Sequence, residues 1–141
     1  MSELNTNKIR EQIYSHFLRL LWILSVFFAL ALVVITAQYY SFRTDINFLL
    51  AKQDFITDIV WMSAFYMHIT GSIACLAVGP FQFIPSFRKK HLRLHRFLGK
   101  IYLASIFFLA APSGLYMAVF ANGGWGAQLG FLVLSFLWFT S

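Results

Sequence analysis

Apolar residues in this chain gather into long stretches that are separated by polar segments. The first stretch runs from Leu20 to Tyr40 and the second from Ile59 to Phe87, both without Asp, Glu, Lys or Arg, and a third spans residues 97–120. A helix needs about 20 apolar residues to cross the hydrocarbon core of a bilayer. These stretches therefore predict three transmembrane helices, at about 17–40, 59–80 and 97–120.

Proline and glycine are expected to set the ends of these helices. Pro80 lacks a backbone donor and disfavours helix in the residue before it, so the second helix should end near Gly79. Pro112 should kink the third helix, and the glycine-rich residues 121–126 should form a turn. Residues 127–141 then supply fifteen residues, or about 22 Å of helix, which is short of the core thickness of about 30 Å. We expect a truncated fourth span.

This pattern predicts an all-α membrane protein, built as a bundle of three full spans plus the truncated fourth. The whole chain, residues 1–141, forms one transmembrane domain in this interpretation. Because the fourth span is short, we expect the chain to be the N-terminal fragment of a longer protein, with further helices or an oligomer completing the bundle.

Composition supports a membrane environment. The chain is 60% hydrophobic and only 11% charged, with a mean hydropathy of +0.71, whereas soluble domains carry about 25% charged residues. A net charge of +6 would suggest nucleic acid in a soluble protein, but here the bases form a block beside an apolar stretch, so we expect no nucleic-acid partner. The single cysteine, Cys75, excludes an internal disulfide and a C-x-x-C metal pair.

The distribution of positive charge predicts the orientation. Lys8, Arg10 and Arg19 precede the first apolar stretch, and six bases lie between the second and third. The loop at 41–58 instead holds two bases and three acids. Cytoplasmic segments carry an excess of Lys and Arg, so the N-terminus is expected to be cytoplasmic. An outer aromatic belt should then contain Tyr39, Tyr40, Trp61, Tyr116 and Trp125.

Two segments, "GPFQFIPSFRKKHLRLHRFLGKIYL" and "GGWGAQLGF", carry a recognisable pattern. They resemble the prokaryotic membrane-protein family catalogued as domain of unknown function 2306, over about residues 60–141. The resemblance implies a multi-pass protein of a prokaryotic cytoplasmic (inner) membrane, with further helices and a second His/Arg-containing stretch beyond this chain. The family has no assigned activity. The matching positions are Gly79, Pro80, Gln82, Phe83, Arg88, His95, Arg96, Gly99, Lys100, Tyr102, Gly124 and Gly130.

His68 lies in the middle of the second predicted span, where an ionisable side chain is a functional candidate. At 100° per residue it shares a stripe of mostly small residues, and small residues let helices approach closely. We expect the stripe to be a helix interface, with Gly71, Cys75 and Gly79 as packing positions. It comprises Ala64, His68, Gly71, Ser72, Cys75 and Gly79.

Three roles for His68 remain open at this point. It could donate a hydrogen bond to a neighbouring helix, ligate a b-type haem for which Gly71 and Ser72 leave room, or relay protons. Haem ligation by two histidines needs both at one depth, and His95 should lie about 18 Å away along the helix axis. A second ligand would therefore have to come from outside this chain.

The basic block between the second and third spans favours phosphate over metal. His91 and His95 are spaced as a metal pair would be, but the surrounding positive charge repels a further cation. We expect no metal site there and a contact with anionic phospholipid headgroups instead. The six bases are Arg88, Lys89, Lys90, Arg93, Arg96 and Lys100.

Other polar residues near this block are candidates for ligand contacts or for polar helix interfaces. Gln82 should satisfy backbone groups freed by the bend after Pro80, while His95 and Tyr102 should share the face of the third helix that packs on the second. No phosphate loop, nucleophile elbow or metalloprotease motif occurs, and we identify no catalytic residue. The sequence thus favours a non-catalytic integral membrane protein whose basic cytoplasmic loop contacts anionic lipid or a partner, with a haem electron-transfer protein as the alternative.

Overall fold

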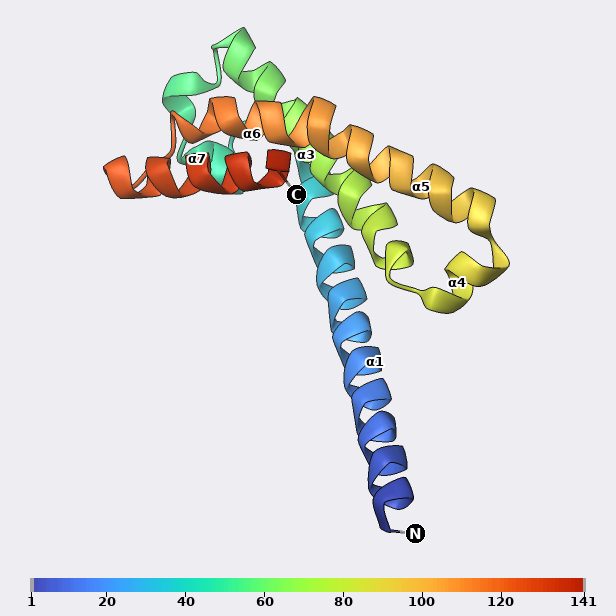
Figure 1. Ribbon diagram of the computed structural model, residues 1–141. Helices are drawn as coiled ribbons and strands as arrows, with labels where there is room; N and C mark the ends of the chain where they lie inside the picture. The colour runs from blue at the N-terminus through green and yellow to red at the C-terminus, as the bar shows by residue number, and fades with distance from the viewer. Residues whose placement is uncertain (1, 141) are drawn as a thin grey trace.

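The computed structural model describes the backbone of residues 2–140 and the side chains of residues 8–138 and 140, and these residues contain helices and no strands. Figure 1 shows the helices in chain order. They are α1 (Ser2–Ala37), η1 (Gln38–Ser41), α2 (Asn47–Leu50), η2 (Gln53–Phe55), α3 (Ile59–Gln82), α4 (Pro85–Lys90), α5 (Leu92–Ala104), η3 (Ser105–Ala110), α6 (Ala111–Ala118) and α7 (Gly124–Thr140).

Three helical stretches are long and apolar enough to cross a membrane: Lys8–Ser41, Ile59–Gln82 and Leu92–Ala118. The all-α architecture and the three full spans predicted from the sequence are therefore confirmed. The fourth helix, α7, has 17 residues, which corresponds to about 25 Å and is shorter than a span that crosses the hydrocarbon core.

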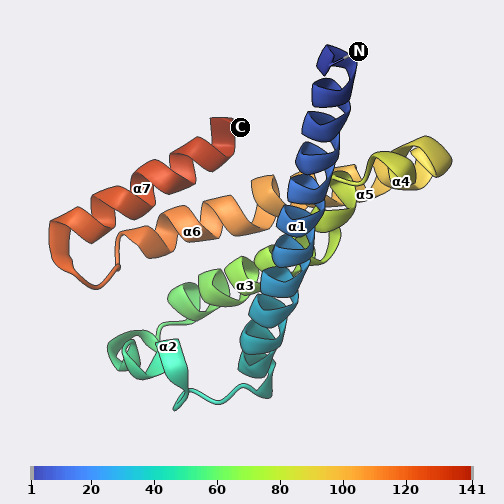
Figure 2. The same ribbon diagram turned by 90° about the horizontal axis from the view of Figure 1, so that it is seen from below.

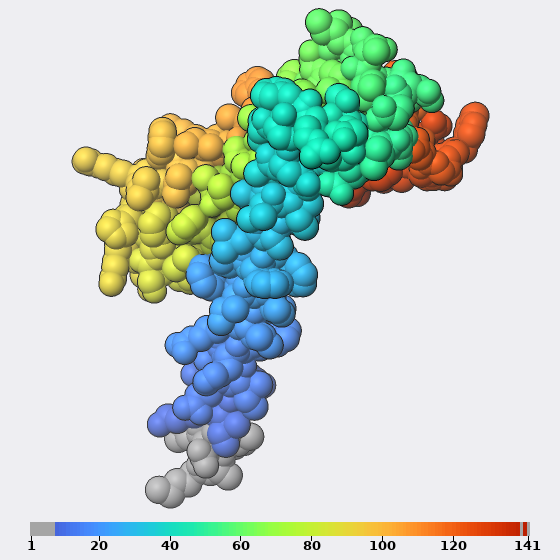
Figure 3. Space-filling model, turned by 180° about the vertical axis from the view of Figure 1, so that it is seen from behind, coloured from blue at the N-terminus to red at the C-terminus, as the bar shows by residue number. Residues whose placement is uncertain are grey.

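Two helices begin earlier than hydrophobicity alone predicts. α1 begins at Ser2 rather than near residue 17, and α5 begins at Leu92 rather than near 97. The added segments are rich in Lys, Arg, Glu and Gln, which are good helix formers although they are polar. As a result α1 projects well beyond the other helices (Figure 3).

The effects of Pro80 and Pro112 on the helices differ from those predicted from the sequence. α3 continues through Pro80 to Gln82, because a proline in the last turn removes only one helical hydrogen bond. The Pro80 carbonyl accepts a hydrogen bond from Trp22 Nε1 of α1 at 3.0 Å. Before Pro112, the helix widens into a π-helix, η3, which gives the chain a place to absorb the missing donor and the bulk of the ring.

The helices pack as an antiparallel set around α3. The continuous helix α5–η3–α6 runs antiparallel along α3, α1 crosses α3, and α7 folds back on α6 (Figures 1 and 2). Gly123 and Gly124 form the turn before α7 with φ of 104° and 72°, a left-handed conformation that glycine adopts without a steric penalty.

One end of the bundle is closed by residues 42–58, and we call it the capped end. α2 and η2 fold over the start of α3 (Figure 3), and a buried apolar cluster forms beneath them from Tyr39, Leu49, Trp61, Phe65 and Ile69. Asp58 caps α3 by accepting hydrogen bonds from the Val60 and Trp61 amides. Tyr39 and Trp61 are only 8% and 1% exposed, so these two expected belt residues instead form part of this core.

The opposite end, where α3 gives way to α4 and α5, is the basic end. Hydrogen bonds place α1 antiparallel to α3: Trp22 contacts Pro80 near the basic end, and Tyr40 Oη lies 2.6 Å from Thr70 Oγ1 on the side of the capped end. The bases of α4 and α5 therefore lie at the end of the bundle opposite residues 42–58, and the charged start of α1 projects beyond this end, away from α4 and α5 (Figure 1).

Candidate functional site

Gly71 marks a close approach between α3 and η3, which follows α5. A Cβ atom at this position would lie 2.8 Å from both the Ala110 backbone nitrogen and Leu109 Cβ, and 3.0 Å from the Ser105 carbonyl oxygen. Real Cβ atoms do not approach other heavy atoms this closely, so only glycine permits the contact. The backbones of α3 and η3 are thus in direct contact at the centre of the bundle.

His68 lies one turn from Gly71 and binds the same neighbouring helix. Its Nδ1 lies 2.9 Å from the Ala110 carbonyl oxygen, and because a carbonyl only accepts, Nδ1 carries the proton in this contact. Ser113 Oγ donates to the same oxygen at 3.2 Å. The imidazole also fills the space beside Gly114, where a Cβ would lie 3.1 Å from the ring.

This packing removes the room expected for a porphyrin at Gly71. The space that the missing side chain leaves is taken by the backbone of η3. The hydrogen bond to Ala110 does fix the tautomer that leaves Nε2 as the unprotonated nitrogen, which is the arrangement found in metal-ligating histidines. His68 is therefore oriented as a metal-ligating histidine would be, but the space beside Gly71 is filled by η3.

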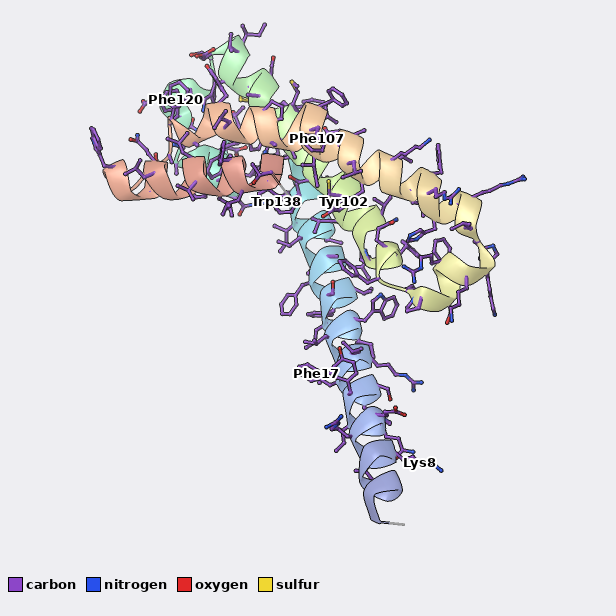
Figure 4. The ribbon with its side chains drawn as sticks, in the orientation of Figure 1. Lys8, Phe17, Tyr102, Phe107, Phe120 and Trp138 are labelled. Atoms are coloured by element: carbon purple, nitrogen blue, oxygen red, sulfur yellow. The ribbon has the colours of Figure 1, made fainter. Side chains whose placement is uncertain are left out.

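Cys75, Gly79 and Tyr102 form the next layer toward the basic end. The Tyr102 ring lies 3.5 Å from the position of a Cβ at Gly79, and Cys75 Sγ lies 3.7 Å from the Tyr102 carbonyl oxygen. Tyr102 belongs to α5 where that helix runs beside α3 (Figure 4). Together these residues connect α3 and α5.

Gln82 and His95 lie at the basic end itself. Gln82 Oε1 is 3.3 Å from the position of a Cβ at Gly99, and Gly99 is one helical turn after His95 on α5. Gln82 Nε2 and His95 Nδ1 are both buried, and neither has a hydrogen-bond partner among the described residues. The Phe87 ring lies beside His95, with the ring centroids 6.4 Å apart. We call Gln82, His95 and Gly99 the Gln82–His95 cluster.

The six bases around this cluster are exposed and unpaired. Side chains tipped with nitrogen project outward from α4 and α5 (Figure 4), and among the described residues the ion pair that forms is Arg43 with Asp45, at the capped end. The exposed bases are Arg88, Lys89, Lys90, Arg93, Arg96 and Lys100.

The predicted site residues therefore separate into two places. Gln82 and His95 lie together at the basic end, with Tyr102 one layer deeper, whereas His68 pairs with Ala110, fifteen positions along the helix from His95, or about 22 Å. Within the described part of the chain, no three His, Cys, Asp or Glu residues come close enough to hold a metal ion.

The family of this chain follows from sequence comparison. Residues 65–141 match the family described as "Predicted membrane protein (DUF2306)". The chain belongs to this family. It is thus a membrane protein of a family without an assigned function, and the matched residues include His68, the Gln82–His95 cluster and all six bases.

A fungal protein shares part of this DUF2306 sequence. "Ava biosynthesis cluster protein G" of Aspergillus versicolor is 42% identical over 50 residues, which cover 36% of this chain and 14% of that protein. The chain thus aligns with about a seventh of the length of this relative. No solved structure matches the chain significantly.

Lys52 is a polar contact that the sequence analysis missed. Its side chain is 3% exposed, and Nζ donates to the Phe120 carbonyl oxygen and, at 2.6 Å, to Asn122 Oδ1. Burial lowers the pKa of Lys52 below its usual value of 10.5. Asn122 Nδ2 in turn donates to the Ala51 carbonyl at 3.3 Å. Through these hydrogen bonds Lys52 and Asn122 connect the capped end to the turn between α6 and α7.

No local sequence signal identifies this contact, because the partners lie 68 and 70 positions away. The one hint is that Lys52 directly follows the apolar residues 48–51. Lys52 also lies outside the region that matches the DUF2306 family, whereas Phe120 and Asn122 lie inside it.

Proposed function

We propose that this DUF2306 protein is a non-catalytic integral membrane protein that binds anionic phospholipid headgroups through the basic segment 88–100. The observation that carries this proposal is the exposure of six bases without an acidic partner in the described residues. Each Lys or Arg near an anionic leaflet contributes about 1 kcal/mol of attraction, so the six together supply substantial affinity without a shaped pocket.

Apolar side chains beside these bases support a position at the membrane surface. Phe97, Leu92 and Leu94 of the segment are exposed, Phe97 by 60%, and Phe83, which precedes the segment, is 77% exposed. Aromatic and aliphatic side chains next to Lys and Arg are typical of helices that lie at the boundary between headgroups and acyl chains. The segment can therefore contact both parts of a lipid.

The proposal includes an orientation. By the positive-inside rule the basic end faces the cytoplasm, with the N-terminus, and the capped end faces outward. We propose the cytoplasmic membrane of a prokaryote as the location, although the similar fungal segment shows that such sequences also occur in a eukaryote.

Cysteine labelling tests this orientation. In a Cys75→Ser background, Asp54→Cys and Lys90→Cys each place a thiol at an exposed position at one end of the bundle. A membrane-impermeant maleimide added to intact cells should label Asp54→Cys and should label Lys90→Cys only after the membrane is opened. The reverse result would invert the proposed orientation, and labelling of both in intact cells would contradict the topology.

Lipid binding tests the proposed function. The double variant Lys89→Gln/Lys90→Gln should bind vesicles containing phosphatidylglycerol more weakly than the wild type, with a shallower dependence on salt, because screening acts on fewer charges. Equal binding of the wild type to neutral and to anionic vesicles would refute the proposal.

A b-type haem protein is the second candidate, supported by the orientation of His68 through Ala110. A second axial ligand would come from another chain or from a further segment. The absorption spectrum of the protein purified in detergent separates the two candidates: a Soret band that His68→Ala abolishes would favour the haem protein.

A longer protein or an oligomer would also cover the exposed apolar faces of α1 and α7.

A further inference from the structure

The basic end contains two buried polar atoms that its own fold does not satisfy. Gln82 Nε2 and His95 Nδ1 are shielded from solvent and have no hydrogen-bond partner among the described residues. A buried donor without a partner destabilises the folded protein, and most buried polar atoms in native proteins are paired. Two such atoms on neighbouring helices at one level of the bundle call for a shared explanation.

The surrounding groups hold the Gln82 side chain in place without satisfying it. Gly99 leaves the space that the amide occupies, since a Cβ there would lie 3.3 Å from Oε1. Trp22 of α1 is already bonded to the Pro80 carbonyl through Nε1. The Phe87 ring beside His95 offers no strong acceptor.

The chemistry of the two atoms indicates the kind of group that would pair with them. An amide nitrogen only donates, whereas Nδ1 of histidine donates in the imidazolium and in one neutral tautomer and accepts in the other. The donating form of His95 is the one that matches Gln82 Nε2. Two donors among exposed bases favour an oxygen that bears negative charge.

No acidic side chain that the structure describes lies near these two atoms. Glu11 belongs to the projecting start of α1, and Asp45, Asp54 and Asp58 belong to the capped end. An anionic oxygen of another molecule would satisfy both atoms.

We propose that the Gln82–His95 cluster is a specific site for a phosphate oxygen at the basic end, with Gln82 Nε2 and His95 Nδ1 as the two donors. The site rests on the proposed lipid binding and adds selectivity to it. Summed charge attracts every anionic headgroup, whereas two fixed donors discriminate by the number and placement of free oxygens. A phosphomonoester presents three unesterified oxygens and a diester two, so we expect a preference for monoesters.

The experiment compares matched variants of the full chain in detergent. Gln82→Leu and His95→Leu remove one donor each, Gln38→Leu makes the same change at an exposed position toward the capped end, and Lys89→Gln removes one charge. The stabilisation of each protein against heat is measured with phosphatidic acid, phosphatidylglycerol and inorganic phosphate, and converted to affinity by linkage.

The wild type and Gln38→Leu should bind phosphatidic acid more tightly than phosphatidylglycerol. Gln82→Leu and His95→Leu should each lower the affinity for phosphatidic acid about tenfold, as expected for one hydrogen bond to a charged group, and reduce the preference. Lys89→Gln should lower both affinities in equal proportion. Without lipid, Gln82→Leu should be no less stable than the wild type, because it removes an unpaired buried atom.

The outcomes separate the site from the function on which it rests. Binding of anionic lipid by the wild type with the same headgroup ratio in Gln82→Leu and His95→Leu would overturn the site and leave the lipid binding intact. No binding of anionic lipid by the wild type would overturn both.

The inorganic phosphate measurement assigns the source of the oxygen. Protection by inorganic phosphate as strong as by phosphatidic acid, and lost in Gln82→Leu, would support the site and make free phosphate its ligand. Should Gln82→Leu fail to fold, Gln82→Met keeps the length of the side chain, and failure of both would overturn the site by showing that the amide is needed for folding itself.

Discussion

The two ends of this bundle differ in how their charged side chains are paired. At the capped end, Lys52 is buried and its ammonium group binds Phe120 and Asn122. At the basic end, six bases are exposed and form no ion pair with the described residues. Gln82 Nε2 and His95 Nδ1 at this end, like Trp61 Nε1 at the capped end, are buried without a hydrogen-bond partner among the described residues. The difference lies both in composition, because the six bases gather at the basic end, and in pairing, because Lys52 at the capped end is buried and hydrogen-bonded.

This difference separates stability from binding. Polar groups that find protein partners contribute to folding, and their loss leaves other buried groups unsatisfied. Polar groups that find none are available to a ligand, and natural proteins tolerate such local destabilisation where a function requires it. We therefore expect mutations at the capped end to affect stability and mutations at the basic end to affect binding.

The largest expected effect compares two tryptophans. Trp61 is 1% exposed in the core of the capped end, so Trp61→Ala should lower the free energy of unfolding by about 3–5 kcal/mol. Trp22 is half-buried and bonded to Pro80, and Trp22→Ala should cost roughly 1–2 kcal/mol. Unfolding in mild detergent, followed by tryptophan fluorescence and circular dichroism, measures both. A larger loss for Trp22→Ala would reverse the comparison.

The next effect compares one substitution at the two ends. Lys52→Met removes the ammonium group from the Phe120 carbonyl and from Asn122, leaving both less satisfied, and should lower the free energy of unfolding by about 2–3 kcal/mol. Lys89→Met changes an exposed side chain and should alter it by less than about 0.5 kcal/mol. The midpoint of thermal unfolding is measured for each variant and compared with that of the wild type. Equal shifts for the two variants would show that the buried contacts of Lys52 do not contribute to stability.

A smaller effect should appear in the pH dependence of stability. Because burial lowers the pKa of Lys52, the folded protein holds this proton less tightly than the unfolded chain. Stability contributed by this group should therefore rise with pH, from just below the folded pKa up to the unfolded value near 10.5. The difference in stability between the wild type and Lys52→Met, measured from pH 8 to about 10.5, should follow this trend; a flat difference would contradict it.

The smallest effect concerns an exposed ion pair at the capped end. Arg43 and Asp45 form a salt bridge at 2.8 Å with side chains 63% and 64% exposed, and such pairs contribute little in water. Asp45→Asn should change the free energy of unfolding by at most about 0.5 kcal/mol. A change as large as that of Lys52→Met would mean that exposure does not distinguish the polar contacts of this end.

Several features of the fold could be predicted from the sequence because they depend on local properties. The three spans follow from the length of the apolar stretches, and the stripe through His68, Gly71 and Gly79 follows from helical periodicity. In the structure, Gly71 and Gly79 of this stripe face η3 and α5 respectively. The ends of the helices were predicted less accurately, because polar residues such as those before Leu20 continue a helix as readily as apolar residues do.

The candidate site was predictable as a set of residues but not as an arrangement. The basic block, Gln82 and His95 stand out as polar residues in an apolar chain. Whether each of these residues has a hydrogen-bond partner depends on the groups that α1 and α5 place beside α3. Such contacts join residues that are distant in sequence: the hydrogen bond between Trp22 and Pro80 spans 58 positions. The belt prediction was wrong for Tyr39 and Trp61, because α2 and η2 fold back over them.

By itself, the sequence determined that the chain is helical, that three of its helices are long and apolar enough to cross a membrane, and that positive charge gathers beside α4 and α5. These properties depend on the hydrophobicity and spacing of neighbouring residues, which solvent and helix geometry act on directly. The tertiary structure alone decided that Lys52 is buried and paired, that η3 is a π-helix against Gly71, and that Gln82 Nε2 and His95 Nδ1 find no partner among the described residues. Each of these depends on groups that are distant in sequence and meet only when the helices pack, since a hydrogen bond exists only where both partners are brought within reach.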